Sequence, residues 1–442
     1  MRKSLSYKIL AALMAAGSFG LYAATPAAAD VQLDVQLKDD QLRANGNAIV
    51  IEKNKLTKPN TLDLSSVSEV YGIGSTALSA DTDYYTGNAD SGNVEINSST
   101  FGRVYGGYTD GSNDNATANN NTVTLNGSNI DYVYGGHSGH RSAYKNTVTI
   151  TGGNYDAVVG GQSGNNADSN VVSISNAAIN RYIIGGEGDT ANENIVTITK
   201  STITENSGIL GWALTGGVSY AGGAEKNQVI ISSSTIIGNV YGAYIYNNNG
   251  QLANKNNITV TGNSNIINAN LYGYDTNSGA TGSGNTLTLN GWSGSTKSVQ
   301  NFNNINFENI KWNNDGTVLN ITGNTEKDAL ANTNIKLNKL NFSGGTQLNT
   351  GDSMTFVKGT DLGIDATKVT IAPEFTAGVA TVGTGDVEVD ENSVKYTLTE
   401  VKQNDQIDLV AQTRAASAAF VNQGTDLISD SLDTISRDDN YG

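Results

Sequence analysis

The sequence predicts an all-β protein, a right-handed parallel β-helix (solenoid), on three observations. Short stretches of alternating apolar and polar residues recur along the chain. A Gly-Gly pair follows many of them, as in "NTVTLNGSNIDYVYGG" (121–136) and "NTVTITGGNYDAVVGG" (146–161). No proline, which would remove a ladder donor, lies between positions 60 and 345. Repeats of this length cannot bury their own apolar face, so we expect them to stack on one another.

Each repeat supplies four inward positions. Val123 and Leu125 share one face of a strand, because side chains alternate between faces with a period of two. Ile130 and Val133 follow in the same repeat. We expect these four side chains to be buried, with their counterparts in neighbouring coils directly above and below. The first glycine after the second strand marks a period of 25 to 34 residues: Gly72, Gly106, Gly135, Gly160, Gly185, Gly216, Gly242 and Gly273.

The residues between the strands suit tight corners. Asparagine and glycine tolerate the left-handed backbone that such corners need. Asparagines at equivalent positions can also stack into ladders of amide groups. The variable segments 109–120 and 246–257 are expected to project from one edge of a rod roughly 45 Å long, at about 4.8 Å per coil.

The segments around the rod follow in chain order. Residues 1–29 have a basic start, an apolar stretch and small residues before position 30, which predicts a secretory signal peptide. Residues 30–58 are more charged and lack the repeat, so we expect an N-terminal cap. The repeat rod spans 59–345. Residues 346–412 are expected to form an irregular β module that closes it.

The last segment, 413–442, changes period. The stretch "TRAASAAFVNQGTDLISDSLDTI" is rich in alanine, and Ala416, Phe420 and Leu427 occur at helical spacing. We therefore expect residues 414–429 to form a short C-terminal helix that is loosely attached to the rod.

Charge and cysteine content exclude several classes of function. The formal net charge is −16, and a field of that sign repels nucleic acid and anionic lipid. The chain has no cysteine, so it can form no disulfide and perform no thiol chemistry. We expect no nucleic-acid partner and no cofactor.

Taken together, these features resemble a known family. The leader, the Asn/Gly-rich repeats, the segments "WNNDGTVLNITGN" and "LNTGDSMTF", and the helix "RAASAAFVNQGTDLI" are similar to the passenger of a Gram-negative autotransporter (type V secretion). The resemblance implies a β-helical passenger exported to the cell surface and an autochaperone-like module at 346–412. It also implies that 413–442 is a linker helix and the start of a translocator barrel, the rest of which is missing from this chain.

The sequence predicts no catalytic residue and no metal ligand. His137 and His140, the only histidines, form an H-x-x-H pair without a third ligand, so we expect a solvated loop. The segment "GGEGDT" (185–190) occurs once and lacks the periodic aspartates of a calcium-binding repeat. No register repeats the acidic residues that occur in loops: Asp110, Asp114, Glu187, Asp189 and Glu193.

A row of tyrosines is the candidate binding site. Tyr105, Tyr134, Tyr241 and Tyr272 share one repeat position with Tyr71, and other coils have Val159, Ile184 or Thr215 there. Each follows an inward residue, so we expect these side chains to point outward. An exposed aromatic row could bind sugars or another rod. The alternative is a stack that stiffens the sheet.

The sequence therefore predicts a non-catalytic autotransporter passenger that acts as an adhesin or self-association factor. Its expected location is the cell surface, the outer membrane or the extracellular space. Its expected partners are host or neighbouring-cell surface molecules, glycans or the same protein. Two alternatives remain open: a secreted β-helical enzyme that degrades polysaccharide, and a structural spacer in a surface layer.

Overall fold

The computed structural model describes much of the chain. The described residues are 35–38, 41–45, 49–53, 55–58, 62–73, 87–109, 115–205, 212–246, 252–275, 281–323, 326–341, 348–375, 380–403, 413–423 and 425. The predicted signal peptide lies outside them, as does the end of the predicted tail helix.

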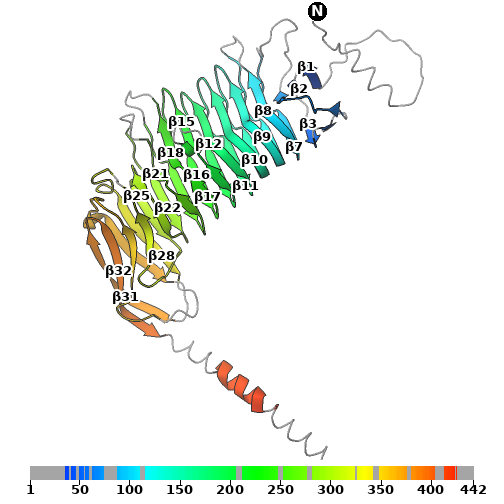
Figure 1. The fold of residues 1–442 in the computed structure, drawn as a ribbon. Helices are drawn as coiled ribbons and strands as arrows, with labels where there is room; N and C mark the ends of the chain where they lie inside the picture. The colour runs from blue at the N-terminus through cyan, green and yellow to red at the C-terminus, as the bar shows by residue number, and fades with distance from the viewer. Residues whose placement is uncertain are drawn as a thin grey trace, which may run out of the picture.

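The described chain is a parallel β-solenoid, which confirms the predicted fold class (Figure 1). Its coils stack three ladders of parallel strands, and several long strands turn a corner and so belong to more than one ladder.

The first ladder contains β3 (Ile49–Glu52), β7 (Asn93–Asn97), β9 (Thr122–Ser138), β10 (Thr147–Ser163), β11 (Val171–Ser175), β13 (Ile195–Thr199), β16 (Gln228–Ser232), β19 (Asn257–Thr261), β22 (Thr286–Asn290), β25 (Asn304–Glu308), β28 (Asn334–Asn341) and β30 (Val369–Phe375). The second adds β8 (Thr100–Thr109), β12 (Ala178–Gly188), β14 (Thr202–Thr204), β17 (Thr235–Ile237) and β20 (Asn265–Ile267). The third adds β2 (Gln41–Asn45), β6 (Glu69–Ile73), β15 (Trp212–Ser219), β18 (Asn239–Ile245), β21 (Asn270–Tyr272) and β24 (Ser298–Gln300).

The main core forms where the repeat predicts it. Val123, Leu125 and Val133 are 0% exposed and Ile130 is 2% exposed, which confirms their burial. Val123 pairs with Val94 in the preceding coil and with Val148 in the next. The inward residues of successive coils therefore lie directly above one another, and the stack buries collectively what no single coil can bury.

A buried asparagine ladder runs beside this core, as expected. Asn146 illustrates the pattern: its backbone N–H and its Nδ2 both donate to Oδ1 of Asn170, at 2.9 Å and 3.0 Å. Seven successive members are 0% exposed: Asn121, Asn146, Asn170, Asn194, Asn227, Asn256 and Asn285. The ladder supplies acceptors for backbone groups at a corner where the strand pairing is interrupted.

The left-handed corners precede these asparagines, and their residue types differ from the expectation. Lys145, Glu193 and Lys226 adopt φ of 55°, 57° and 57° at this corner. Asparagine and glycine occur more often at a second left-handed corner, with Gly127 at 56° and Asn176 at 53°. Stacking thus imposes the left-handed conformation on lysine and glutamate, which rarely adopt it.

The coil has a fourth side, and it shows that the variable segments do not project along their whole length as expected. Thr117 pairs with Ser142, and Leu252 pairs with Thr281, so the ends of segments 109–120 and 246–257 belong to the stack rather than project from it. This side carries a column of fully or almost fully buried alanines: Ala89, Ala118, Ala143, Ala167, Ala191, Ala224 and Ala253. Residues 110–114 and 247–251 lie outside the described part.

The two ends differ from the regular rod. Parallel pairing already includes β2 and β3, inside the range predicted as a cap, whereas β1 (Val35–Lys38), β4 (Lys55–Lys58) and β5 (Leu62–Asp63) pair antiparallel. Near the C-terminus, a second sheet contains β23 (Gly294–Thr296), β27 (Thr317–Ile321), β29 (Ser353–Lys358), β32 (Ser393–Gln403) and β31 (Ala380–Asp390). The short elements β26 (Ile310–Lys311) and η1 (Ala366–Lys368) lie between these strands in the chain.

A helix at 413–423 confirms the predicted tail helix as far as the described residues extend. It lies beyond β31 and away from the rod (Figure 1). Phe420 is 78% exposed and Val421 is 65% exposed, so its apolar side chains do not pack on the solenoid.

Candidate binding faces of the solenoid

The predicted tyrosines lie in one column on the third ladder, in two groups separated by Val159, Ile184 and Thr215. Tyr71 pairs with Tyr105 and Tyr105 with Tyr134; further along, Tyr241 pairs with Tyr272. The rings of Tyr105 and Tyr134 stack with centroids 4.9 Å apart and an angle of 8°. Those of Tyr241 and Tyr272 stack at 4.8 Å and 7°. The stacking that the alternative expects is therefore confirmed, and its stiffening effect on the sheet stays a prediction.

The expectation of an exposed row is wrong. Tyr105 is 7% exposed and Tyr241 is 6% exposed, while Tyr134 and Tyr272 are half-buried. The rings do point away from the main core, but they form a second apolar layer outside it: Tyr105 packs with Ala118, and Tyr241 packs with Val218. A binding role for the four tyrosines stays a prediction, and only the two half-buried rings reach solvent appreciably.

A second column, here called the covering row, lies over the tyrosines. Tyr108 meets Tyr105 edge-on at 4.8 Å, and Tyr244 meets Tyr241 edge-on at 5.6 Å. Paired coil by coil, the covering row consists of Tyr108, His137, Gln162, Glu187, Val218 and Tyr244. The pairing of strands across coils brings these residues together, although they are spread over more than a hundred positions of sequence.

The centre of the covering row is a hydrogen-bonded chain along the rod. His137 Nδ1 lies 2.8 Å from Oε1 of Gln162, and Gln162 Nε2 donates to Glu187 at 3.0 Å. The Tyr220 hydroxyl donates to the other oxygen of Glu187. Burial raises the pKa of the Glu187 carboxyl, against the effect of these two hydrogen bonds.

The covering row includes one of the two histidines. The His137 ring stacks on Tyr108 at 4.9 Å, so it is part of the covering row rather than of a solvated loop as expected. His140 is exposed. Within the described ranges, no cluster of three His, Cys, Asp or Glu side chains is placed to hold a metal ion.

Glu187 and Glu193, two of the acidic residues considered from the sequence, do not share a site. Glu187 lies in the covering row, whereas Glu193 occupies a corner and forms an ion pair with Lys226 at 2.8 Å. Asp110 and Asp114 lie outside the described residues.

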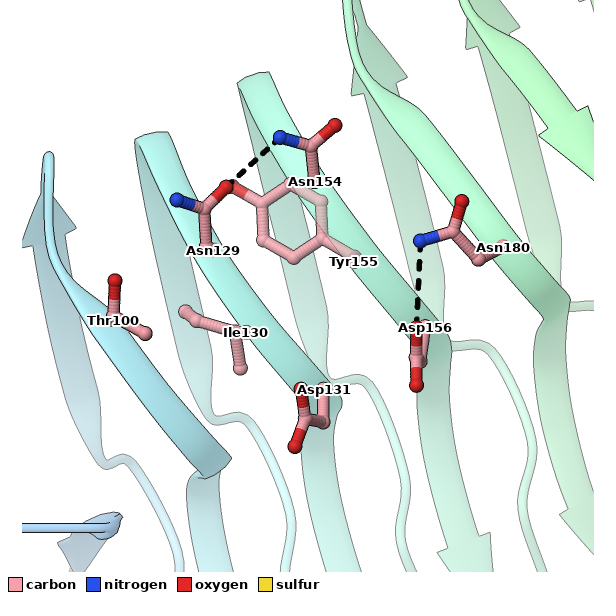
Figure 2. A pocket seen from close by; sticks show the side chains of 8 residues that line it. All are labelled: Thr100, Asn129, Ile130, Asp131, Asn154, Tyr155, Asp156 and Asn180. Carbon is pink, nitrogen blue, oxygen red and sulfur yellow. Dashed lines mark hydrogen bonds between the residues drawn. The ribbon is translucent and has the colours of Figure 1, made fainter.

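A groove on the second ladder is the candidate binding site that the sequence interpretation missed. It has a volume of about 210 Å³ and extends over adjacent coils of β8, β9, β10 and β12 (Figure 2). Its lining residues are Thr100, Asn129, Ile130, Asp131, Asn154, Tyr155, Asp156 and Asn180. Ile130 and Tyr155 are buried and belong to the main core, so the accessible lining is polar.

The polar groups of the groove are held in register. Asn154 Nδ2 donates to Oδ1 of Asn129 at 2.9 Å, and Asn180 Nδ2 lies 3.4 Å from Asp156, as the dashed lines in Figure 2 show. Asp156 also faces Arg181 at 3.7 Å. The signal in the sequence was the pattern Asn-x-Asp at 129–131 and again at 154–156, because alternate residues of a strand share a face.

Comparisons with known proteins give no match. No family model, no curated protein and no solved structure is significantly similar to this chain. Among the described residues, no helix combines the length and the apolar character that crossing a membrane requires.

Proposed function

We propose that this chain is a non-catalytic adhesin of the autotransporter type, displayed on the cell surface or secreted, and that its groove binds a glycan. The observation that carries the proposal is the polar groove across β8, β9, β10 and β12. Amides such as Asn129 and Asn154 both donate and accept hydrogen bonds, and carboxylates such as Asp131 accept them. Sugar hydroxyls need both kinds of partner.

The scaffold suits recognition more than chemistry. The groove residues stand on paired strands, which hold side chains more rigidly than loops do. A general acid needs a carboxyl group sheltered from water, whereas Asp131 is exposed and Asp156 is half-buried. Export is supported by the basic and apolar leader, and the autotransporter assignment by the solenoid followed by an exposed helix at 413–423.

Binding to a glycan array and to cells tests the proposal. The double variant Asn129→Ala, Asn154→Ala removes two hydrogen-bonding side chains and is expected to weaken binding about tenfold or more, since each bond contributes roughly 1 kcal/mol. The matched control is Asn265→Ala, which removes an exposed asparagine from the same ladder in a distant coil. Equal binding by both variants would place the adhesive site elsewhere.

A second candidate function rests on the two carboxylates of the groove. Asp131 and Asp156 come from adjacent coils, and coils stack about 4.8 Å apart, close to the separation of roughly 5 Å found between the paired carboxylates of retaining glycosidases. The enzyme hypothesis predicts release of reducing ends from a bound polysaccharide. Asp131→Asn and Asp156→Asn would each abolish that release while leaving binding in place. An adhesin releases none.

A further inference from the structure

The outward side of the first ladder carries no charge over a long stretch. We call this surface the threonine face: the outward side chains of 122–126, 147–151, 171–175, 195–199, 228–232, 257–261 and 286–290. These are threonine, serine, asparagine, glutamine, valine and isoleucine. Charged residues appear only in the coils beyond, where Glu95 pairs with Thr124 and Glu308 pairs with Asn290. The uncharged surface is notable in a chain whose net charge is −16.

The central column of this face is a ladder of hydroxyls at the coil repeat. Thr124, Thr149, Ser173 and Thr197 pair in sequence, and Thr259 and Thr288 continue the column beyond Ile230. Their side chains are half-buried by their neighbours, so the surface is flat. Within the described part of the chain, none of these hydroxyls makes an intramolecular hydrogen bond.

We infer that a second copy of this chain docks face to face on the threonine face. Any partner that dries this surface must supply hydrogen bonds for the hydroxyls, because an unpaired buried hydroxyl costs roughly 1–3 kcal/mol. A second copy carries the same hydroxyl ladder at the same repeat, so that hydroxyls can pair along the whole length. An apolar surface cannot do this. The inference rests on the proposed adhesive role and names a second copy of this chain as the partner.

Charge favours the same occupant. Two chains of equal net charge repel, and the surface without charge is where they approach each other with least repulsion. The corners that border the face carry charges of both signs: Lys145, Lys255 and Lys200 are exposed, and Glu193 forms an ion pair with Lys226 at one of them.

The size of the face indicates a weak association. Seven coils at about 4.8 Å and strands about 17 Å long give an area of roughly 570 Å² on each copy. The total of roughly 1,150 Å² is at the lower end for specific protein–protein interfaces. Such contacts hold adjacent cells through many copies rather than through one tight dimer.

Sedimentation velocity of the full chain over a concentration series tests the inference. The wild-type chain is expected to form dimers reversibly. The double variant Thr149→Lys, Thr197→Lys places like charges opposite each other and is expected to weaken the dimer more than tenfold. The two lysines also reduce the net negative charge, which by itself would favour association, so a loss of dimer points to the face itself.

The control carries the same charge change on another side of the rod. Thr202→Lys, Thr235→Lys alters outward residues of the second ladder, which pair with each other. This variant should associate as the wild type does. A wild-type chain that stays monomeric, or equal association by both variants, overturns the inference. The inference is also overturned if the wild-type chain stays monomeric and the variant Thr149→Lys, Thr197→Lys loses binding to an insoluble polysaccharide. Glycan binding through the groove is measured separately, so either proposal can fail while the other stands.

Discussion

The asparagine ladder and the tyrosine row each place one side chain in every coil, yet they differ in what they tolerate. Asparagine occupies its position without exception from Asn121 to Asn285. The tyrosine position changes to valine, isoleucine and threonine in the middle of the rod and returns to tyrosine at Tyr241. One column requires a particular chemistry, and the other requires only volume.

The geometry explains the difference. Each ladder amide from Asn146 to Asn285 accepts two hydrogen bonds from the preceding coil, so an apolar residue would leave buried donors without a partner. The first glycine of each Gly-Gly pair is equally constrained: a Cβ added at Gly160 would overlap the backbone oxygen of Gly185. The tyrosine row packs between the alanine column and the covering row, where a valine can fill part of the same space.

The largest effect is expected from breaking the asparagine ladder. Asn170→Ala leaves the backbone N–H and Nδ2 of Asn146 without their acceptor and opens a cavity, which should destabilise the protein by roughly 3–5 kcal/mol. Urea unfolding followed by circular dichroism measures this. Asn154→Ala, an exposed amide, should change stability by less than about 1 kcal/mol. Similar losses for both would mean that the buried ladder has no special role.

Substitutions at one tyrosine sharpen the contrast. Tyr134→Ser removes the half-buried ring between Tyr105 and Val159 and should destabilise the protein by roughly 3 kcal/mol. Tyr134→Val reproduces the side chain of the next coil and should lose only about 1 kcal/mol. If valine proves as damaging as serine, the row requires aromatic stacking and not merely volume.

A pH dependence is expected from the covering row. The folded-state pKa of Glu187 is raised by burial, so the native state binds a proton that the unfolded state releases between the unfolded and folded pKa values. Stability from this group therefore falls as pH rises through that window. Glu187→Gln should raise the urea midpoint at pH 8 and lose this advantage near pH 4.

Glu193→Gln is the control, because the stability contribution of Glu193 has the opposite pH dependence. The pKa of Glu193 is lowered by its hydrogen bond and ion pair with Lys226, so its small contribution is present at neutral pH and lost on acidification. A Glu187→Gln variant with the same pH profile as the wild type would contradict the burial of that carboxyl.

The smallest effect concerns Thr215, the polar residue among the three that replace tyrosine in the row. Thr215 occupies the row position between Ile184 and Tyr241, and its hydroxyl is buried without a hydrogen-bond partner in the described chain. Thr215→Val keeps the shape and removes this polar group, so it should stabilise the protein by up to about 1 kcal/mol. Destabilisation in thermal unfolding would show that the hydroxyl has a partner.

Much of the fold was predictable because it depends on local periodicity. The alternation in Val123 and Leu125, the repeated asparagine and the Gly-Gly pair all follow from the alternating faces of strands and from the need to stack. The helix at 413–423 was predictable for the same reason, since helical spacing is also a local property.

Only the tertiary structure decided which outward residues meet solvent. Alternation places Tyr105 outside the main core, but whether another layer covers it depends on how the alanine column and Tyr108 return to that side of the coil. The same holds for the groove, where Asn129, Asn154 and Asn180 come from three coils. The sequence by itself determined which residues point inward and that the coils stack. The packing of outer layers and the joining of coils into sites arise from contacts between distant segments, so a local pattern such as Asn-x-Asp does not by itself specify them.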